Sequence, residues 1–190
     1  MFSRVFPGKP YESAARGLYD TIVSQARAPE FYRDAGVPDT VDGRFEALLL
    51  HMFLVLQRLK RDHAQTSKLG QTLFDILFFD MDQSIRVSGV GDLKVGPRIK
   101  AMGQAFYGRM AAYEAGLEEG PEALSEALCR NLYGTVTPPE PEVLDRVVGY
   151  IQAEAKALSE QETAALLRGE ARFGSTRELR KMEPAPRKTD

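Results

Sequence analysis

Three carboxylates lie close together in the middle of the chain, at Asp75, Asp80 and Asp82. Carboxylate pairs can transfer protons or bind a divalent cation. Asp75 and Asp82 are seven residues apart and so share one face of a helix, whereas Asp80 points elsewhere. No glycine-containing calcium loop surrounds them. We therefore predict that these acids pair with Arg or Lys of a neighbouring helix and form no metal or catalytic site.

Two histidines, His51 and His63, are the other candidates for a metal ligand or a general base. Glu46 precedes His51 by five residues, which does not match the Glu-x-x-His spacing of a di-iron bundle. No Cys/His group has the spacing of a zinc site. We predict a buried, hydrogen-bonded imidazole at His51 and a solvated one at His63, and we expect no metal and no cofactor.

Glycines cluster in the segment GVGDLKVG, at Gly89, Gly91 and Gly96. A phosphate-binding loop would follow a strand and contain Gly-Lys-Ser/Thr, and this segment has neither feature. We interpret it as a bend between two helices. The loop and the helix after it predict a modest basic surface, able to meet an acidic partner or anionic lipid, from Lys94, Arg98, Lys100 and Arg109.

Composition restricts the class of protein. The chain has 190 residues, of which 43% are apolar and 27% are charged, as in a globular protein of one domain. Its net charge of −2 lacks the excess of Lys and Arg that binding to nucleic-acid phosphates requires. The single cysteine, Cys129, excludes an internal disulfide, fits a reducing compartment and lies among leucines as a buried thiol. Neither the first ten residues nor the apolar run 47–56 has the length of an export signal or a membrane span.

Apolar residues recur at helical spacing along most of the chain. One stripe, at intervals of three or four residues, consists of Ile99, Met102, Phe106, Met110, Tyr113 and Leu117. It predicts a helix over about 97–117, and similar patterns predict helices over 11–26, 29–35, about 40–60, about 66–81, 121–133 and 143–158. The helix over 40–60 is apolar on nearly every side and is the expected centre of the fold. Ser159 and Glu162 suggest a capping box that opens a last helix, which Gly169 can end.

No segment alternates apolar and polar residues for long enough to predict a strand. The predicted fold class is all-α, a single helical bundle of about seven to eight helices without a substantial sheet. We expect an N-terminal segment at 1–10, a helical domain at 11–173 and a flexible charged tail at 174–190.

Four ordered segments resemble a known family: LYDTIVSQARAPEFY (18–32), GVPDTVDGRFEALLLHMFLVLQRL (36–59), LFDILFFDMD (73–82) and GVGDLKVGPRIKAMGQAFYGRMAAYEAGL (89–117). Together they resemble the ubiquinol-cytochrome c chaperone family, over about residues 18–133. The absence of a long presequence before them resembles the bacterial form of this family.

The resemblance implies a helical, non-enzymatic chaperone that binds newly made cytochrome b and supports assembly of the ubiquinol-cytochrome c reductase complex. It implies a small helical partner protein and the ribosome exit region as further partners in mitochondrial members. The implied location is cytoplasmic, at the inner membrane with peripheral contact, which corresponds to the matrix side in mitochondrial relatives. No direct readout of nucleic acid is expected.

A client with membrane helices offers apolar surface and basic loops, so its chaperone needs an apolar surface with a charged rim. We predict such a partner-binding surface from Gly89, Gly91, Asp92, Arg98, Tyr107, Arg109 and Tyr113, with Asp75, Asp80 and Asp82 as an acidic rim. The same residues could instead hold the fold together.

Two other functions remain open at this point. One is a metal- or lipid-dependent helical enzyme that uses His51 with the acids at 75, 80 and 82. The other is a peripheral membrane adaptor that uses Phe2, Val5 and Phe6 with the basic loop.

Overall fold

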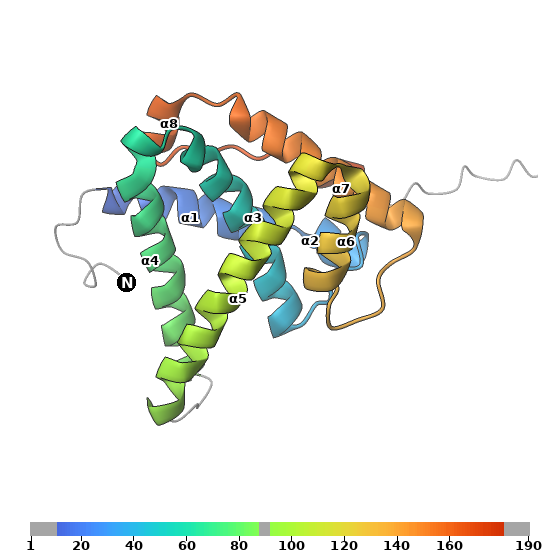
Figure 1. The fold of residues 1–190 in the computed structure, drawn as a ribbon, viewed down its shortest axis with the longest axis horizontal. Coiled ribbons are helices and arrows are strands. Elements are labelled where there is room, and N and C mark those ends of the chain that lie inside the picture. Colours follow the sequence, from blue (N-terminus) through green and yellow to red (C-terminus); the bar gives the residue numbers. More distant parts are fainter. Residues whose placement is uncertain (1–10, 88–91, 181–190) are drawn as a thin grey trace, which may run out of the picture.

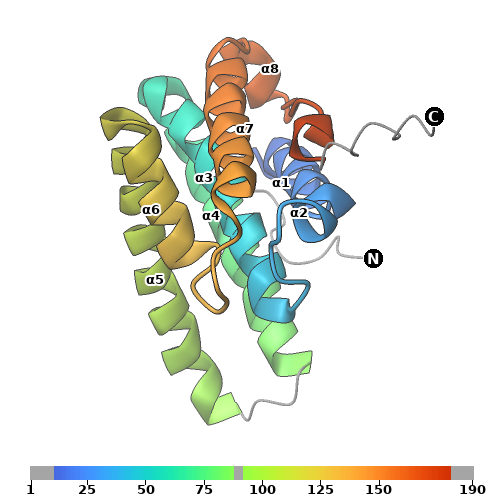
Figure 2. The same cartoon turned by 90° about the vertical axis from the view of Figure 1, so that its right-hand side faces the viewer.

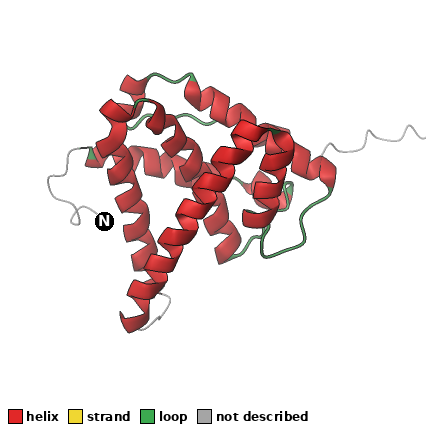
Figure 3. Cartoon of the chain, viewed as in Figure 1, coloured by secondary structure: helices red, strands yellow, loops and turns green. Residues whose placement is uncertain are grey.

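The computed structural model describes residues 11–87 and 92–180. These residues form eight α-helices, one short 3₁₀ helix and no strand (Figure 3). The elements in chain order are α1 (Glu12–Ala26), α2 (Pro29–Arg33), α3 (Val41–Arg61), α4 (His63–Val87), α5 (Asp92–Glu119), α6 (Pro121–Asn131), α7 (Pro141–Ser159), α8 (Thr163–Leu167) and η1 (Thr176–Leu179). The prediction of an all-α single bundle is confirmed.

Helix α3 lies at the centre of the bundle, as predicted. Thr40 caps its N-terminus, because the Thr40 hydroxyl accepts a hydrogen bond of 3.1 Å from the Gly43 N–H. Helices α1, α4, α5 and α7 all pack against it (Figure 2). Buried side chains face each of these neighbours, so α3 needs apolar residues around most of its circumference.

Helix α4 starts earlier than the sequence pattern predicts. Only Asp62 separates it from α3, where a longer polar break was expected. The Thr66 hydroxyl does not cap the helix; it donates hydrogen bonds to the carbonyl oxygens of Leu59 and Asp62, at 2.5 and 3.1 Å. These bonds use the free carbonyls at the end of α3, and the two helices therefore meet in a tight corner.

Helix α5 also starts earlier than predicted, at Asp92, so that Pro97 lies inside it. The predicted apolar stripe faces the core: Phe106 and Tyr113 are buried, and its other members are partly buried against the same cluster. Helices α4 and α5 converge toward the residues that join them and diverge at their other ends (Figure 1). Helix α6 then packs along α5.

The C-terminal segment folds back onto the bundle. The Gly174 N–H donates hydrogen bonds of 2.9 and 3.0 Å to the buried carboxylate of Glu154 on α7. Leu179 is 0% exposed, and Arg180 pairs with Glu30 on α2 at 3.2 Å. Residues 174–180 therefore belong to the folded unit, and the prediction that the flexible tail begins at 174 is wrong; residues 181–190 lie outside the described part.

The predicted capping box before the last helix is not formed. The Ser159 hydroxyl donates to the carbonyl oxygen of Lys156, and Glu162 is the residue that precedes α8, without a side-chain cap. The chain approaches α1 closely after α8, where Gly169 adopts a φ of +84°. A Cβ at Gly169 would lie 2.6 Å from the Ala14 carbonyl oxygen, so only glycine fits here.

Across residues 11–87 and 92–180, none of the helices combines the length and the hydropathy that crossing a bilayer requires.

Candidate partner-binding groove

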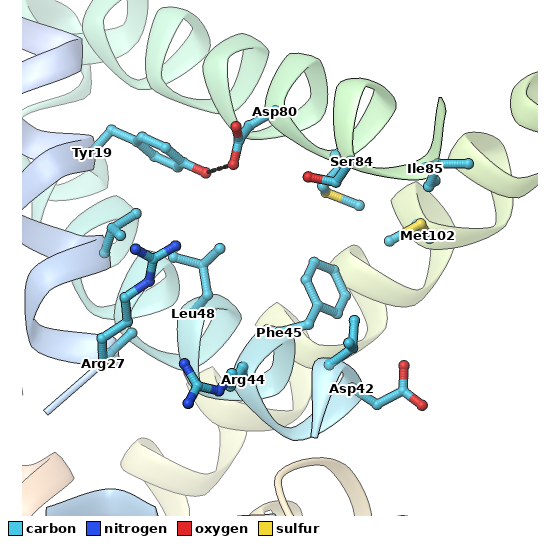
Figure 4. A pocket seen from close by; sticks show the side chains of 14 residues that line it. Tyr19, Arg27, Asp42, Arg44, Phe45, Leu48, Asp80, Ser84, Ile85 and Met102 are labelled. Atoms are coloured by element: carbon cyan, nitrogen blue, oxygen red, sulfur yellow. Dashed lines mark hydrogen bonds between the residues drawn. The ribbon is translucent and has the colours of Figure 1, made fainter. Parts of the chain in front are cut away.

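An apolar groove opens between α1, α3, α4 and the first part of α5 (Figure 4). Its volume is about 440 Å³. The apolar side chains that line it are Val23, Ala26, Val41, Phe45, Leu48, Met81, Ile85 and Met102, and the polar ones are Tyr19, Arg27, Asp42, Arg44, Asp80 and Ser84. We call this site the groove. Its volume lies within the range of pockets that hold small molecules or side chains of a partner.

Helical periodicity explains why these residues meet. On α1 the lining residues Tyr19, Val23 and Ala26 lie four and three positions apart, and on α4 the pairs Asp80–Ser84 and Met81–Ile85 are each four apart. Each set therefore occupies one face of its helix. Where these faces of α1, α3, α4 and α5 meet, the side chains leave a hollow between the helices.

Charged and polar groups form the rim of the groove. The Tyr19 hydroxyl donates a hydrogen bond of 2.8 Å to Oδ2 of Asp80, which joins α1 to α4 (Figure 4). Burial, and then the negative charge of Asp80, raises the pKa of Tyr19, so this phenol stays a donor. Across the groove, Arg44 pairs with Asp39 at 2.6 Å and stacks over Tyr32.

Arg27 is the exposed cation on the α1 side of the rim. Within residues 11–87 and 92–180, no carboxylate lies within ion-pair distance of it. Its positive charge, like that of Arg44, acts to lower the pKa of Tyr32, although burial of the phenol outweighs both and raises that pKa. Both guanidinium groups therefore act on the same corner of the groove.

A second apolar surface lies between α3, α4 and α5. It is built from a cluster of four rings, Phe74, Phe78, Phe106 and Tyr107, which are tilted or edge-on to one another. The ring centroids lie 4.4 Å apart for Phe74 and Phe78 and 5.8 Å apart for Phe74 and Tyr107. We call it the aromatic surface. A hollow of about 310 Å³ beside it is lined by Met110 and Leu56, among others. Tyr107 is 64% exposed, which is unusual for a large aromatic side chain outside an interface.

The predicted acids are divided among separate positions. Asp80 lies on the rim of the groove, while Asp75 accepts a hydrogen bond from Gln71 and Asp82 pairs with Arg86 within α4. The three do not converge on one site. Among the described residues, no group of three or more His, Cys, Asp or Glu side chains is arranged to hold a metal ion.

Two predicted contact residues serve the fold instead. Tyr113 is 0% exposed and packs on Phe53, so its prediction as a surface contact is wrong. Arg109 is half-buried and donates two hydrogen bonds to the carboxylate of Glu46 on α3, which raises the pKa of Arg109. Periodicity placed both residues on α5 correctly, but it could not show that their partners lie on α3.

The remaining predicted residues lie at separate places on or before α5. Gly89 and Gly91 lie outside the described residues. Asp92 is the first residue of α5, and Arg98 is six residues further along it. Tyr107 is the predicted contact residue that the structure places on the aromatic surface.

His51 is buried and hydrogen-bonded, as predicted. It is 0% exposed; Nδ1 lies 2.7 Å from the carbonyl oxygen of Ala47, and Nε2 lies 3.1 Å from the Tyr150 hydroxyl. The Ala47 contact requires a proton on Nδ1, which leaves Nε2 to accept from Tyr150. Burial lowers the pKa of His51 to about 4, so the ring is neutral at pH 7. The Phe31 and Phe173 rings pack edge-on around it, which excludes a substrate from this site.

Sequence patterns missed most of the groove. Four of its apolar residues are only partly buried, and helical spacing alone does not separate such residues from core: Val23, Phe45, Leu48 and Met102. The signal that the sequence offered was that the helix over 40–60 is apolar on nearly every side. Cys129, predicted to be buried, has intermediate exposure, and burial raises the pKa of its thiol.

The fold and these surfaces define a class: an all-α protein whose described surface carries an apolar groove with a charged rim and an adjoining aromatic surface. A family model described as Ubiquinol-cytochrome C chaperone matches residues 33–173, so the chain belongs to this family. The match confirms the resemblance found in the sequence.

Several relatives carry the name ubiquinol-cytochrome c reductase complex assembly factor 1. The chain is 24% identical to the Xenopus laevis protein over 76% of this chain and 72% of that protein. It is 26% identical to the Mus musculus protein over 84% and 54%, and 25% identical to the Homo sapiens protein over 81% and 51%. The chain thus spans about half the length of the two mammalian relatives.

A solved structure supports the same placement. The crystal structure of the Cbp3 homolog from Brucella abortus matches with a TM-score of 0.79 and 35% sequence identity, over 88% of this chain and 92% of that chain.

Proposed function

We propose that this chain is a non-enzymatic assembly chaperone that binds newly made cytochrome b and supports assembly of the ubiquinol-cytochrome c reductase complex. Membership of the ubiquinol-cytochrome C chaperone family supports the assembly role. The observation that carries the binding role is the groove, an apolar hollow of about 440 Å³ with charges at its rim. An unassembled membrane subunit exposes apolar helices that need such cover.

The groove suits an apolar helical segment. Helix-in-groove recognition places large apolar side chains of one face of the ligand into a hollow between host helices. Met81 and Met102 line the groove, and methionine side chains adapt to ligands of different shape. Apolar contact of this kind does not require one particular client sequence. A chaperone that binds several segments of one client needs this tolerance.

Acids on the rim add selectivity. Asp80 and Asp42 line the groove, and neither has an ion-pair partner among the described residues. Membrane helices carry Lys and Arg at the end that stays on the cytoplasmic side. A client segment with its apolar face in the groove can place such a basic residue against Asp80. The Tyr19 hydroxyl holds the Asp80 carboxylate in position for this contact.

We place this activity at the cytoplasmic face of the inner membrane, where a client of this kind is inserted. The aromatic surface, with Tyr107 exposed at its edge, is available for a further partner while the groove is occupied. A small helical protein or the ribosome exit region is the partner that the family resemblance implies there.

Two methionines on α5 provide the test, because Met102 lines the groove and Met110 lies beside the aromatic surface. Both are partly buried. In a respiring host that depends on this chain, we expect Met102→Asp to lower cytochrome b, measured by its haem spectrum, and to lower co-purification of cytochrome b. Met110→Asp, matched in substitution and helix, should retain the client. Normal cytochrome b after deletion of the gene would refute the proposal, and equal loss in both variants at equal stability would refute the groove as its site.

A further inference from the structure

The corner of the groove between α1 and α3 combines features that the holding of an apolar helix does not require. Arg27 is exposed and has no carboxylate within ion-pair distance among the residues described, and Arg44 lies on the same side of the groove (Figure 4). Arg44 is neutralised by Asp39 at 2.6 Å, so the corner keeps one uncompensated positive charge.

The remainder of the groove next to this corner is apolar. The side chains that line this part of the groove are Phe45 and Leu48 of α3, Val23 of α1 and Met102 of α5. The two acids of the lining come from other elements than Arg27: Asp80 is on α4, where the Tyr19 hydroxyl donates to it, and Asp42 is in the first turn of α3. A ligand therefore meets the Arg27 cation at one corner and hydrocarbon beyond it, while the two acids lie at other points of the lining.

We propose that the groove binds a free long-chain carboxylate, with its head group on Arg27 and its acyl chain along the apolar lining. A guanidinium presents two N–H donors that match the two oxygens of a carboxylate. The volume of about 440 Å³ is suited to a single chain of this kind. The guanidinium of Arg44 lies over the Tyr32 ring, at 5.2 Å from its centroid, on the same side of the groove as Arg27 (Figure 4).

Occupancy by such a molecule covers apolar surface that would otherwise face water. Exposed apolar hollows of this size attract other proteins and promote aggregation. The carboxylate fills the space that a client segment uses, so binding of one excludes the other. The inference itself rests on the groove and its charges, and it holds or fails independently of the client.

A chain-length series tests the inference on the purified full chain. Binding of octanoate, decanoate and dodecanoate is measured by calorimetry below their micelle concentrations. Each buried methylene should tighten binding by about fourfold, and the gain should stop once the groove is full. Absence of saturable binding, or affinity that does not change with chain length, would overturn the proposal.

The head group is tested with Arg27→Ala and with dodecanol, which lacks the charge. Arg27→Ala should weaken dodecanoate by about tenfold and leave dodecanol unchanged. The control is Arg130→Ala, which removes an exposed cation on α6 far along the chain from the groove. Equal weakening of acid and alcohol by Arg27→Ala would refute the role of Arg27.

The place of the acyl chain is tested with Val23→Trp, which adds bulk to a partly buried groove residue. It should abolish dodecanoate binding while circular dichroism and the unfolding midpoint remain those of a folded protein. Met110→Trp, beside the aromatic surface, should not change binding. Retained binding in Val23→Trp, or binding to anionic phospholipid vesicles without binding to free dodecanoate, would contradict the assignment.

Discussion

The carboxylate of Glu46 on α3 accepts two hydrogen bonds from the guanidinium of Arg109 on α5, at 2.6 Å from Nε and 2.5 Å from Nη2. Glu46 is buried and Arg109 is mostly covered, whereas another ion pair between α3 and α5, Lys60 with Glu114, is more exposed. The two residues are 63 positions apart. The pair fixes the rotation of α5 and hence which of its faces borders the groove.

Loss of one partner of this pair should be costly. Glu46→Gln leaves the half-buried guanidinium of Arg109 without its counter-charge, and we expect the free energy of unfolding to fall by about 2 kcal/mol. Urea denaturation measures the loss. The matched control is Glu126→Gln, whose partner Arg130 is exposed and which should change stability by less than about 0.5 kcal/mol. Equal losses in the two variants would show that the buried pair contributes no more than an exposed one.

His51 should make the fold sensitive to acid. Its pKa is about 4 in the folded protein and about 6.5 in the unfolded chain, so in this window the unfolded state binds a proton that the folded state does not. Stability is therefore lost as pH falls from about 6.5 to about 4, by about 3 kcal/mol in total. Urea denaturation at several pH values should show this slope.

The control for this pH dependence is the difference between variants. His51→Gln should lack the acid-dependent loss, and His63→Gln, at an exposed position, should keep it. Burial raises the pKa of Glu154, and this shift increases stability as the pH falls, opposite to the effect of His51. Because Glu154 is present in every variant, its contribution cancels when the variants are compared. A slope that persists in His51→Gln would assign it to other groups.

Two glycines inside helices should respond oppositely to the same substitution. A Cβ at Gly17 would lie 2.8 Å from the Gly169 carbonyl oxygen, whereas one at Gly149 would meet nothing within 4 Å. Gly149→Ala should raise the unfolding free energy by about 0.5 to 1 kcal/mol, because alanine restricts the unfolded chain and favours the helix. Gly17→Ala should lower it by about 1 to 2 kcal/mol, since the clash outweighs that gain. Thermal unfolding of both variants measures the two signs, and a gain at both positions would show that the approach of Gly169 to α1 is loose.

Leu179 should stabilise the fold from its place near the end of the described chain. It is fully buried, and Leu179→Ala should cost about 3 kcal/mol through lost burial and the cavity left behind. Val136→Ala, at an exposed position, is the control and should change the unfolding midpoint little. An unchanged unfolding midpoint in Leu179→Ala would show that residues 174–180 do not contribute to the stability of the folded unit.

Much of the fold follows from sequence periodicity because helices bury one face. Spacing and apolar neighbours within a helix were enough to predict three features: the central role of α3, the buried stripe on α5 and the buried imidazole of His51. The predicted starts of helices were less accurate. Helix α4 begins earlier, over polar residues, and α5 begins before Pro97. There, packing and backbone hydrogen bonds outweigh the local preference of the residues.

The site was harder to predict than the fold, because it depends on pairs from different helices. Nothing near Arg109 in sequence points to Glu46, and nothing near Asp80 points to Tyr19. Burial separates Tyr113, a core residue, from Tyr107, an exposed one, although both lie on the same helix. Gly174 gives no sign in sequence that Glu154 will bind its N–H.

The contact between Arg180 and Glu30 joins residues 150 positions apart. Its neighbour Leu179 enters the core only when the polypeptide has been made up to that point. Loop closure over so long a separation is slow compared with the formation of local helices. During synthesis, α2 and the adjoining face of α7 therefore gain the cover of η1 last, and a nascent or prematurely terminated chain leaves this side of the bundle exposed.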